Sequence, residues 1–537
     1  MIGAGTGPWA QCETDQFVSA DVEQGDDFGQ VLATSGNRVI IGAPRDDDAG
    51  ASSGAVYVFE RQPSGWVQVQ KLVALDAAAG ANFGFDVDID GDSIIVGAFG
   101  DMELGFDAGA AYVFDYDGTQ WNQSAKLLAS NSFVGDLFGI DVAIQGDRAF
   151  VGACQLTAFE IFGQGAGRAH VYERVAGNWS ETAILVATDA DDGDRFGVAV
   201  DSDGPGTRVV VGAQSDDEAA MDAGASYVFE LVGDVWVQSQ KLIASDAGAG
   251  HRDGTGVSLS GDRLLVGCYH HDALGFEAGA AYIWELVGGT WVQCARLLAS
   301  DAADNARFGR RLKLEEDLAV IGAAFGSTSG GGGGYLFERR SGTWEEVATY
   351  TAGDIDAGDE FGQGVTLGEG RVLIGAPLND VGGTAYEFMA RAANSATYGC
   401  SNPAGSLTLL SGTPAVGEVC VLGVDNPLGT QSIGSIPFVA FALSPQVGYP
   451  CGVSIPGWGM SGPTGELLIS VSGPNPVGPI LVGPPWQGPG QPSRMNLILP
   501  TACRAWGITV YCQGIMLDPT GSPRFGLTSG LELVLGS

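Results

Sequence analysis

Basic residues are scarce in this chain. Its 537 residues include 25 lysines and arginines against 64 aspartates and glutamates, which gives a formal net charge of −39. Binding to nucleic acid depends on basic side chains that neutralise phosphates, and binding to anionic lipid depends on the same charges. The composition therefore argues against nucleic acid and acidic membranes as partners.

Long apolar runs are also missing. No stretch of the sequence reaches the roughly 18 to 20 apolar residues that a membrane-spanning helix needs, so no membrane span is expected. The first residues, Met1 to Pro8, lack the basic and apolar regions of a secretory leader. Few lysines and many Asp, Gly and Ser residues are nevertheless typical of an extracellular or cell-surface protein. We therefore expect that a leader is missing from this sequence.

Residues suited to catalysis are few. The chain has four histidines, and only His270-His271-Asp272 combines histidine with an acid. No phosphate-binding loop or His-Glu-x-x-His motif occurs in the sequence. These absences leave the question of an enzyme open but favour a non-catalytic protein.

The nine cysteines fall into two groups. Those expected as small buried fillers of strands are Cys12, Cys154, Cys268 and Cys294. Those clustered in the tail are Cys400, Cys420, Cys451, Cys503 and Cys512. The tail cluster predicts one or two disulfides formed in an oxidising compartment, with a pairing that the sequence does not determine.

What the chain does contain is an internal repeat, in which a Phe-Gly pair precedes a Gly-Ala step by about 14 residues. The Phe-Gly pairs start at Phe28, Phe83, Phe138, Phe196, Phe308 and Phe361, with a degenerate copy placed at Thr255-Gly256. The Gly-Ala steps start at Gly42, Gly97, Gly152, Gly212, Gly267 (followed by Cys268), Gly322 and Gly375. Their spacings are 55, 55, 60, 55, 55 and 53 residues. This period is too long for a helical solenoid unit and fits a four-stranded propeller blade.

One copy of the repeat can be read strand by strand. Residues 83–89 alternate as a first strand, residues 93–98 form an apolar second strand, and residues 110–114 form a third. Residues 121–128 form a fourth strand that begins with Trp121. The equivalent tryptophans of the other copies are expected to pack between blades and not to form a ligand cage.

The seventh copy lacks a fourth strand, because the repeat ends soon after Phe388. A stray Trp9-Ala10-Gln11 stands at the N-terminus, 19 residues before Phe28, where other copies have 17. We expect the N-terminal segment to supply the missing strand and close the ring, which removes exposed sheet edges. The sequence thus predicts an all-β, seven-bladed propeller over residues 9–390.

Composition changes abruptly near residues 391–398, which are expected to be a linker. The following segment, residues 399–537, holds most of the prolines and almost no net charge. It alternates short apolar runs with Pro/Gly/Ser turns, a pattern that favours a β-sandwich-like C-terminal domain over disorder.

Acidic residues follow two classes of long loop, those between strands two and three and those between blades. Both classes must emerge on one face of the ring, because successive strands of a blade alternate in direction. We call this side the long-loop face. Its crowded carboxylates are expected to bind cations or a cationic partner. Candidate calcium ligands there are Asp46, Asp47, Asp48, Asp101, Asp107, Asp216, Asp217 and Asp222, with a solvated run of charge as the alternative.

At these residues the chain resembles the FG-GAP repeat family, the seven-bladed propellers of integrin α-subunits and many secreted bacterial proteins. The resemblance covers residues 9–390. It implies a calcium loop between strands one and two, but this connection is short here. The best remnant is Asp201-Ser202-Asp203-Gly204, with Asp201 and Asp203 as candidate ligands. Residues 86–92 imitate the calcium spacing, yet we expect strand alternation to put their side chains on opposite faces.

The tail is similar, more loosely, to C-terminal β-modules of secreted bacterial proteins at residues 399–407. The leading functional hypothesis is a monomeric, non-catalytic binding or adhesion scaffold outside the cell, which presents the acidic face to a protein or glycan, with calcium as a candidate cofactor. The alternative is a polysaccharide hydrolase or lyase with its site in the central depression, by fold analogy. A structural role in a surface layer is a third hypothesis.

Overall fold

The computed structural model describes residues 9–11, 13–62, 65–155, 165–326, 330–379 and 382–390, and beyond them the strands named below. Its contacts divide the chain into two units, Met1–Ala390 and Arg391–Ser537, which are described separately. The described residues form strands and turns, and none of them forms a helix able to cross a membrane.

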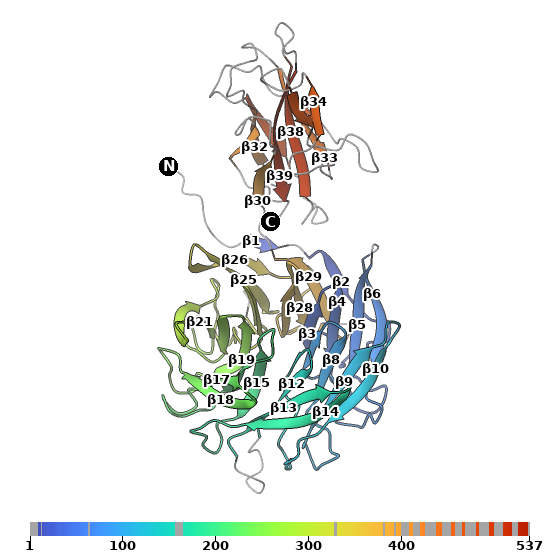
Figure 1. Cartoon of the computed structure of the whole chain (residues 1–537), viewed down its shortest axis with the longest axis vertical. Coiled ribbons are helices and arrows are strands. Elements are labelled where there is room, and N and C mark those ends of the chain that lie inside the picture. Colours follow the sequence, from blue (N-terminus) through green and yellow to red (C-terminus); the bar gives the residue numbers. More distant parts are fainter. Residues whose placement is uncertain are drawn as a thin grey trace. The chain divides into compact units, whose positions relative to one another are not determined.

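Seven antiparallel sheets surround a common axis in the first unit (Figure 1). The first strands, which line the axis, are β3 (Val31–Ser35), β7 (Val87–Asp90), β11 (Val142–Gln145), β15 (Phe196–Ser202), β19 (Asp253–Ser260), β23 (Leu312–Glu315) and β27 (Gly364–Gly368). The second strands are β4 (Arg38–Ala43), β8 (Ser93–Ala98), β12 (Arg148–Ala153), β16 (Arg208–Ala213), β20 (Arg263–Cys268), β24 (Leu318–Ala323) and β28 (Arg371–Ala376).

The outer half of each blade holds the remaining strands. The third strands are β5 (Ala55–Gln62), β9 (Ala110–Tyr116), β13 (Arg168–Val175), β17 (Ala225–Val232), β21 (Ala280–Val287), β25 (Gly333–Arg340) and β29 (Thr384–Met389). The fourth strands are β6 (Gly65–Leu72), β10 (Trp121–Leu127), β14 (Asn178–Leu185), β18 (Val235–Leu242), β22 (Thr290–Leu297), β26 (Thr343–Tyr350) and, in blade seven, β2 (Asp15–Phe17). The predicted all-β, seven-bladed propeller is therefore confirmed.

The sequence of each strand reflects its place in the blade. β8 is buried at every position and apolar after its first residue, Ser93, because neighbouring blades cover both of its faces. The outermost β6 alternates between exposed and half-buried residues, because one of its faces meets water. The tryptophans of the fourth strands were predicted to pack between blades. Trp121, Trp291 and Trp344 are buried, whereas the tryptophans of the other blades are half-buried.

The repeated dipeptides bring consecutive blades into backbone contact. A Cβ atom placed on Gly42 of blade one would lie 2.2 Å from the carbonyl oxygen of Gly84, in the Phe-Gly pair of blade two. The same contact joins Gly97 to the Gly139 carbonyl, where the distance would be 2.1 Å. Only glycine tolerates this approach, so the motif marks the places where one blade touches the next.

The phenylalanine of each pair fills the core between blades. Phe83 packs edge-on against Tyr112 and Phe114 of the third strand of its own blade, with ring centroids 5.4 and 5.9 Å away. Its cluster also includes Val56 and Leu72 from blade one, so the apolar core lies between the two sheets. This arrangement explains why the motif recurs in every blade.

The N-terminal segment closes the ring, but with a different strand from the predicted one. β2 pairs antiparallel with β29, with Phe17 opposite Ala385, and so serves as the fourth strand of blade seven (Figure 1). Trp9-Ala10-Gln11, predicted for this role, forms β1 (Trp9–Gln11), which pairs in parallel with the edge of blade six. The longer spacing from Trp9 to Phe28 reflects this offset, because Trp9 does not occupy the tryptophan position of the repeat.

Glu387 of β29 ties this seam together. Its buried carboxylate accepts hydrogen bonds from Arg61 at 2.8 Å, Trp66 at 3.2 Å and the Thr14 hydroxyl at 3.1 Å. Arg371 Nε lies 3.1 Å from Oε1, the oxygen that also binds Arg61 and Trp66. The seam thus joins the N-terminal segment, blade one and blade seven through one charge that is fully partnered.

The degenerate fifth copy lies two residues before its predicted position. Asp253 forms the same backbone bridge to the preceding blade that Phe83 forms, and the Gly254 carbonyl approaches Gly212. The prediction of Thr255-Gly256 was therefore wrong, because a charged residue replaces the expected ring. The Asp253 carboxyl is buried, and this burial raises its pKa to about 8, although Ala244 and Gly254 N–H groups donate to it.

The strands described in the second unit form three sheets. A five-stranded sheet has the order β30 (Asn394–Tyr398), β39 (Phe525–Val534), β38 (Thr509–Leu517), β33 (Ile436–Ala442) and β36 (Ile480–Val482). The others are β31 (Leu407–Ser411), β32 (Val419–Val424) and β37 (Ser493–Ile498), and the pair β34 (Val453–Pro456) and β35 (Thr464–Leu467).

These strands bear on two sequence predictions. The predicted linker, residues 391–398, includes β30, which pairs with β39 and belongs to the second unit. The sandwich remains a prediction. The tail cysteines and Cys12 lie outside the residues whose side chains the structure describes, so the disulfides also remain predictions.

Replacing Gly97 with alanine should destabilise the propeller, because the added methyl group would meet the Gly139 carbonyl of the next blade. We expect a loss of about 3 kcal/mol in the free energy of unfolding. Gly204→Ala is the matched control, since nothing lies within 4 Å of its Cβ position. Urea unfolding of both variants measures the difference, and equal stability would contradict the role given to the motif.

Candidate binding face and central channel

The two classes of long loop do meet on one face. The Phe106 carbonyl, between strands two and three of blade two, accepts a 2.9 Å hydrogen bond from Gly135 in the loop to blade three. Met221 and Gly250 form the equivalent bond after blade four, at 2.8 Å. These bonds hold neighbouring loops together and create a continuous surface.

Each acidic loop of blades one, two and four is organised around a buried aspartate. In blade one the Tyr57 hydroxyl donates to Asp46 Oδ2 at 2.9 Å, and Lys71 Nζ lies 2.7 Å from the same oxygen. Blade two repeats this with Asp101, Tyr112 and Lys126, and blade four with Asp216, Tyr227 and Lys241. The aspartate thus connects the loop to the third and fourth strands of its own blade.

The lysine of each group is surrounded by carboxylates. Lys126 Nζ lies 2.6 Å from Asp76, 2.9 Å from Asp101 and 2.7 Å from Glu103. Burial by itself lowers the pKa of Lys126, but hydrogen bonds to these carboxylates more than offset it and raise the pKa above its ordinary value. An ammonium group therefore sits where several acidic side chains converge, the position that a metal ion would take.

The ten candidate calcium ligands do not converge on one site. Asp48 binds Lys71 and Asp47 is exposed, while Asp217 accepts the Asp222 N–H at 2.6 Å within its own loop. Among the residues that the structure describes, no group of three or more His, Cys, Asp or Glu side chains is arranged to hold a metal ion. Calcium binding remains a prediction.

Of the three remaining candidates, Asp107 belongs to the same loop as Asp101, whereas Asp201 and Asp203 lie in and after β15. Asp107 has a positive φ of 48° in its loop, and burial raises its pKa. Asp203 accepts N–H groups of Thr207 and Arg208 at 2.8 and 3.0 Å, and so closes the turn between β15 and β16. Asp201 points into the central channel and not toward Asp203, because the two residues belong to a strand and to the turn that follows it.

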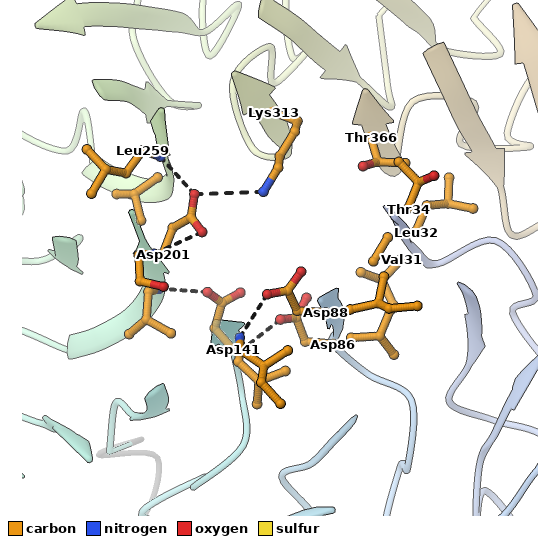
Figure 2. Close-up of a pocket in the computed structure, with 18 of the residues that line it drawn as sticks. Val31, Leu32, Thr34, Asp86, Asp88, Asp141, Asp201, Leu259, Lys313 and Thr366 are labelled. Atoms are coloured by element: carbon orange, nitrogen blue, oxygen red, sulfur yellow. Dashed lines mark hydrogen bonds and ion pairs between the residues drawn. The ribbon is translucent and has the colours of Figure 1, made fainter. Parts of the chain in front are cut away.

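The central channel is a polar cavity of about 560 Å³, lined by the first strands (Figure 2). Its carboxylates accept hydrogen bonds from the neighbouring first strand, whose N–H groups on this side have no partner strand. Asp86 binds Val142 N at 2.9 Å and Asp88 binds Ile144 N at 2.8 Å. The expectation that alternation separates these acids was wrong, because residues at every second position share one face of a strand.

Blade six supplies cations that cross the channel. Arg311 Nη1 lies 3.2 Å from Asp86 and 3.4 Å from Asp141. Lys313 Nζ lies 3.8 Å from Asp201 (Figure 2). Burial raises the pKa of Asp86, and burial together with the Asp86 charge raises the pKa of Asp141 well above its ordinary value. These groups bind one another and the backbone, so the channel acidity serves first to join blades.

The two histidines of the His270-His271-Asp272 cluster contact different acids. His271 Nε2 lies 3.2 Å from Asp246, whereas His270 Nε2 lies 3.5 Å from Glu277. The backbone N–H of Ala273 donates to His271 Nδ1, so both ring nitrogens of His271 are engaged. Cys268 is buried nearby as a free thiol, and Cys154 is buried as well, as expected for small fillers. The same prediction was wrong for Cys294, which is exposed on the outer strand β22.

The long-loop face also carries large apolar side chains that sequence reasoning missed. The exposed ones are Met102, Leu104, Phe106, Phe133, Val134, Met221, Leu274, Phe276, Phe325 and Leu378. Phe106, Met221 and Phe276 occupy the same loop position, since each carbonyl accepts the equivalent inter-blade hydrogen bond. The signal was present in the repeated Leu-Gly-Phe of residues 104–106 and 274–276. The sequence also held a signal for the lysines that bind the buried aspartates. Lys126 follows Asp101 by 25 residues, and the pairs Asp46–Lys71 and Asp216–Lys241 have the same spacing.

Comparison with protein families now agrees with this geometry. The description "FG-GAP repeat" matches seven segments, residues 12–59, 66–114, 121–172, 179–229, 236–284, 291–337 and 344–388. The chain belongs to the FG-GAP repeat family. The second matched segment runs from the fourth strand of one blade to the third strand of the next, so each FG-GAP unit spans two sheets.

No curated protein matches the chain significantly. Among solved structures, the propeller is similar to "Crystal structure of RRP9 WD40 repeats", with 9% sequence identity and a TM-score of 0.45. That likeness covers 71% of this chain and 99% of the other, and it carries no functional argument.

Removing the lysine of an FG-GAP acidic loop should increase calcium affinity, because the ammonium group and the metal ion compete for the same carboxylates. We expect Lys126→Met to bind calcium about tenfold more tightly than the wild type, measured by calorimetric titration. Calcium should also raise the melting temperature of this variant more than that of the wild type. Arg148→Met, on the opposite face, is the control. Equal calcium affinity in wild type and Lys126→Met would show that the lysine does not occupy a cation position.

Asp88→Asn should change how stability depends on pH. Burial raises the pKa of Asp88 to about 6 in the folded protein, above the value of about 4 in an unfolded chain. Folding therefore favours the protonated acid, and the free energy of unfolding falls as the pH rises from about 4 to 6.

The amide does not ionise, so the variant should gain about 1–2 kcal/mol relative to the wild type between pH 4 and pH 8. Urea unfolding at both pH values measures this gain, with exposed Asp234→Asn as the control. A difference that is independent of pH would contradict it.

Proposed function

We propose that this FG-GAP propeller is a non-catalytic binding scaffold of the cell surface or extracellular space, and that the long-loop face is its binding surface. The observation that carries the proposal is the coincidence of exposed apolar side chains and carboxylates on this face. Large exposed apolar groups among polar residues are typical of interaction sites. Monomeric behaviour is part of the proposal, since two copies of such an acidic face repel each other.

The charges of the two faces differ in how they are used. On the opposite face, where short turns join strands one to two and three to four (the short-turn face), arginines of the second strands bind acids of their own blade and of the next blade's turn. Arg38, for example, binds Glu60 and Asp92. On the long-loop face, Asp47 and Asp192 are exposed and have no cationic partner within 4 Å among the described residues. Uncompensated charge of this kind attracts a partner of the opposite sign and raises its rate of association.

The alternative of a polysaccharide hydrolase or lyase has less support. The channel acids are bound by backbone N–H groups and by Arg311 and Lys313, and the described lining contains no histidine or tyrosine. No observation favours a catalytic pair among them, so the alternative is left as a prediction of fold analogy.

The test uses the full chain and two defined probes, a displayed random-peptide library and an array of neutral glycans. Asp47→Lys combined with Asp192→Lys should abolish binding to the probes that the wild type retains, because the charge of the face is partly reversed. Asp46 is unsuitable for this test, since it is buried against Tyr57 and Lys71. Asp234→Lys, on the short-turn face, is the matched control. Binding that is equal in both variants would place the site elsewhere and overturn the proposal.

A further inference from the structure

We infer that the long-loop face carries two equivalent docking sites for a cationic, partly apolar protein surface, one on blade two and one on blade five. This inference rests on the proposed function and names the partner class. Its anchors are Leu104 and Phe106 in blade two and Leu274 and Phe276 in blade five. All four side chains are exposed, with 44, 53, 52 and 60% of their surfaces accessible.

The two loops are copies of each other. Residues 104–112 read Leu-Gly-Phe-Asp-Ala-Gly-Ala-Ala-Tyr, and residues 274–282 read Leu-Gly-Phe-Glu-Ala-Gly-Ala-Ala-Tyr. Scattered exposed apolar residues are normal on a protein surface. Here the same two large side chains recur at the same loop position, three blades apart. A recurrence in position, residue type and exposure distinguishes these tips from random surface variation.

The backbone fixes both tips in advance of binding. Gly105 and Gly275 have φ values of 142° and 157°, which side-chain-bearing residues rarely adopt. A Cβ atom would lie 3.2 Å from Val134 in the first loop and 2.6 Å from Asp304 Oδ1 in the second. The carbonyls of Phe106 and Phe276 are bound by N–H groups of the next inter-blade loop. Anchors held in this way lose little conformational entropy when a partner binds.

Carboxylates surround each pair of anchors and set the chemistry of the partner. Asp107 flanks the first tip together with Glu103, whose carboxylate also binds Lys126 at 2.7 Å, and Asp272 and Asp304 lie beside the second tip. Asp304 also accepts the Phe276 N–H at 2.9 Å, which keeps an acid beside the ring. A partner surface with Lys or Arg side chains and an apolar recess matches both features. A second copy of this chain and an anionic lipid surface do not, because both carry negative charge.

The occupant is therefore a basic protein segment, and the probe is a synthetic amphipathic peptide of lysine and leucine. Calorimetric titration of the full chain should give two peptides per chain. Leu104→Ser with Phe106→Ser should reduce this to one peptide per chain with unchanged affinity at the other tip. Serine at all four positions should weaken binding about 30-fold or more, because each phenylalanine acts as a buried anchor.

Two control peptides test whether binding needs both positive charge and apolar side chains. A lysine–serine peptide should bind much more weakly than the lysine–leucine peptide, and a glutamate–leucine peptide should not bind. Val175→Ser with Val232→Ser is the control variant, since these valines are as exposed as the anchors but lie on short turns of the opposite face. Its circular dichroism and melting temperature, with those of the serine variants, show that all remain folded.

Several outcomes would overturn the inference. These are wild-type binding that survives in the four-serine variant, equal binding of the lysine–serine peptide, or tip-dependent binding to phosphatidylserine vesicles with calcium in place of the peptide. Dimerisation of the chain through the tips, seen by light scattering, would also overturn it. If the charge reversal of Asp47 and Asp192 abolishes binding while the serine variants bind normally, the proposed function stands and this inference fails.

Discussion

The close approach of glycine to a carbonyl group of the next blade is the contact on which the rest of the propeller depends. Each of these repeat glycines lies against the carbonyl of the following Phe-Gly pair, or of Asp253-Gly254 in blade five, and the same contact between Gly375 and Gly29 joins the last blade to the first. With the backbones this close, the phenylalanine reaches the core between blades and the first strands reach the axis. The motif thus fixes the distance between sheets, and the loops and channel follow from that distance.

The strong negative charge of the chain is tolerated because the fold distributes it. Buried aspartates of the acidic loops bind lysines, and channel aspartates bind backbone N–H groups and cations from blade six. The short-turn face adds arginine pairs between successive blades. Among the described carboxylates that these arrangements leave without a cation are Asp47 and Asp192 of the long-loop face. The binding proposed for this face would use carboxylates other than Asp46 and its equivalents, because those hold the loops to their own blades.

Much of the fold could be read from the chain, because the motif has a fixed period and each blade repeats the same strand pattern. Two predictions were wrong because a local sequence pattern was compatible with two different strand registers. Trp9 looked like the tryptophan of a fourth strand, but pairing of Phe17 with Ala385 set the register two residues away. Thr255-Gly256 resembled a motif copy, but Asp253 forms the backbone bridge. Of the candidate site, the common face of the long loops was predictable, whereas the partners of its carboxylates were not.

The sequence by itself determined the number of blades, the closure by the N-terminal segment and the side on which the acidic loops emerge, because these follow from period and strand direction. Only the tertiary structure decided which charges are free. Lys71 reaches Asp46 from another strand, and Arg311 reaches Asp86 from across the channel, so these pairs depend on distances that strand patterns do not encode. The exposure of Phe106 and Phe276 was decided in the same way. An apolar residue in a loop is buried or exposed according to how neighbouring blades pack around it.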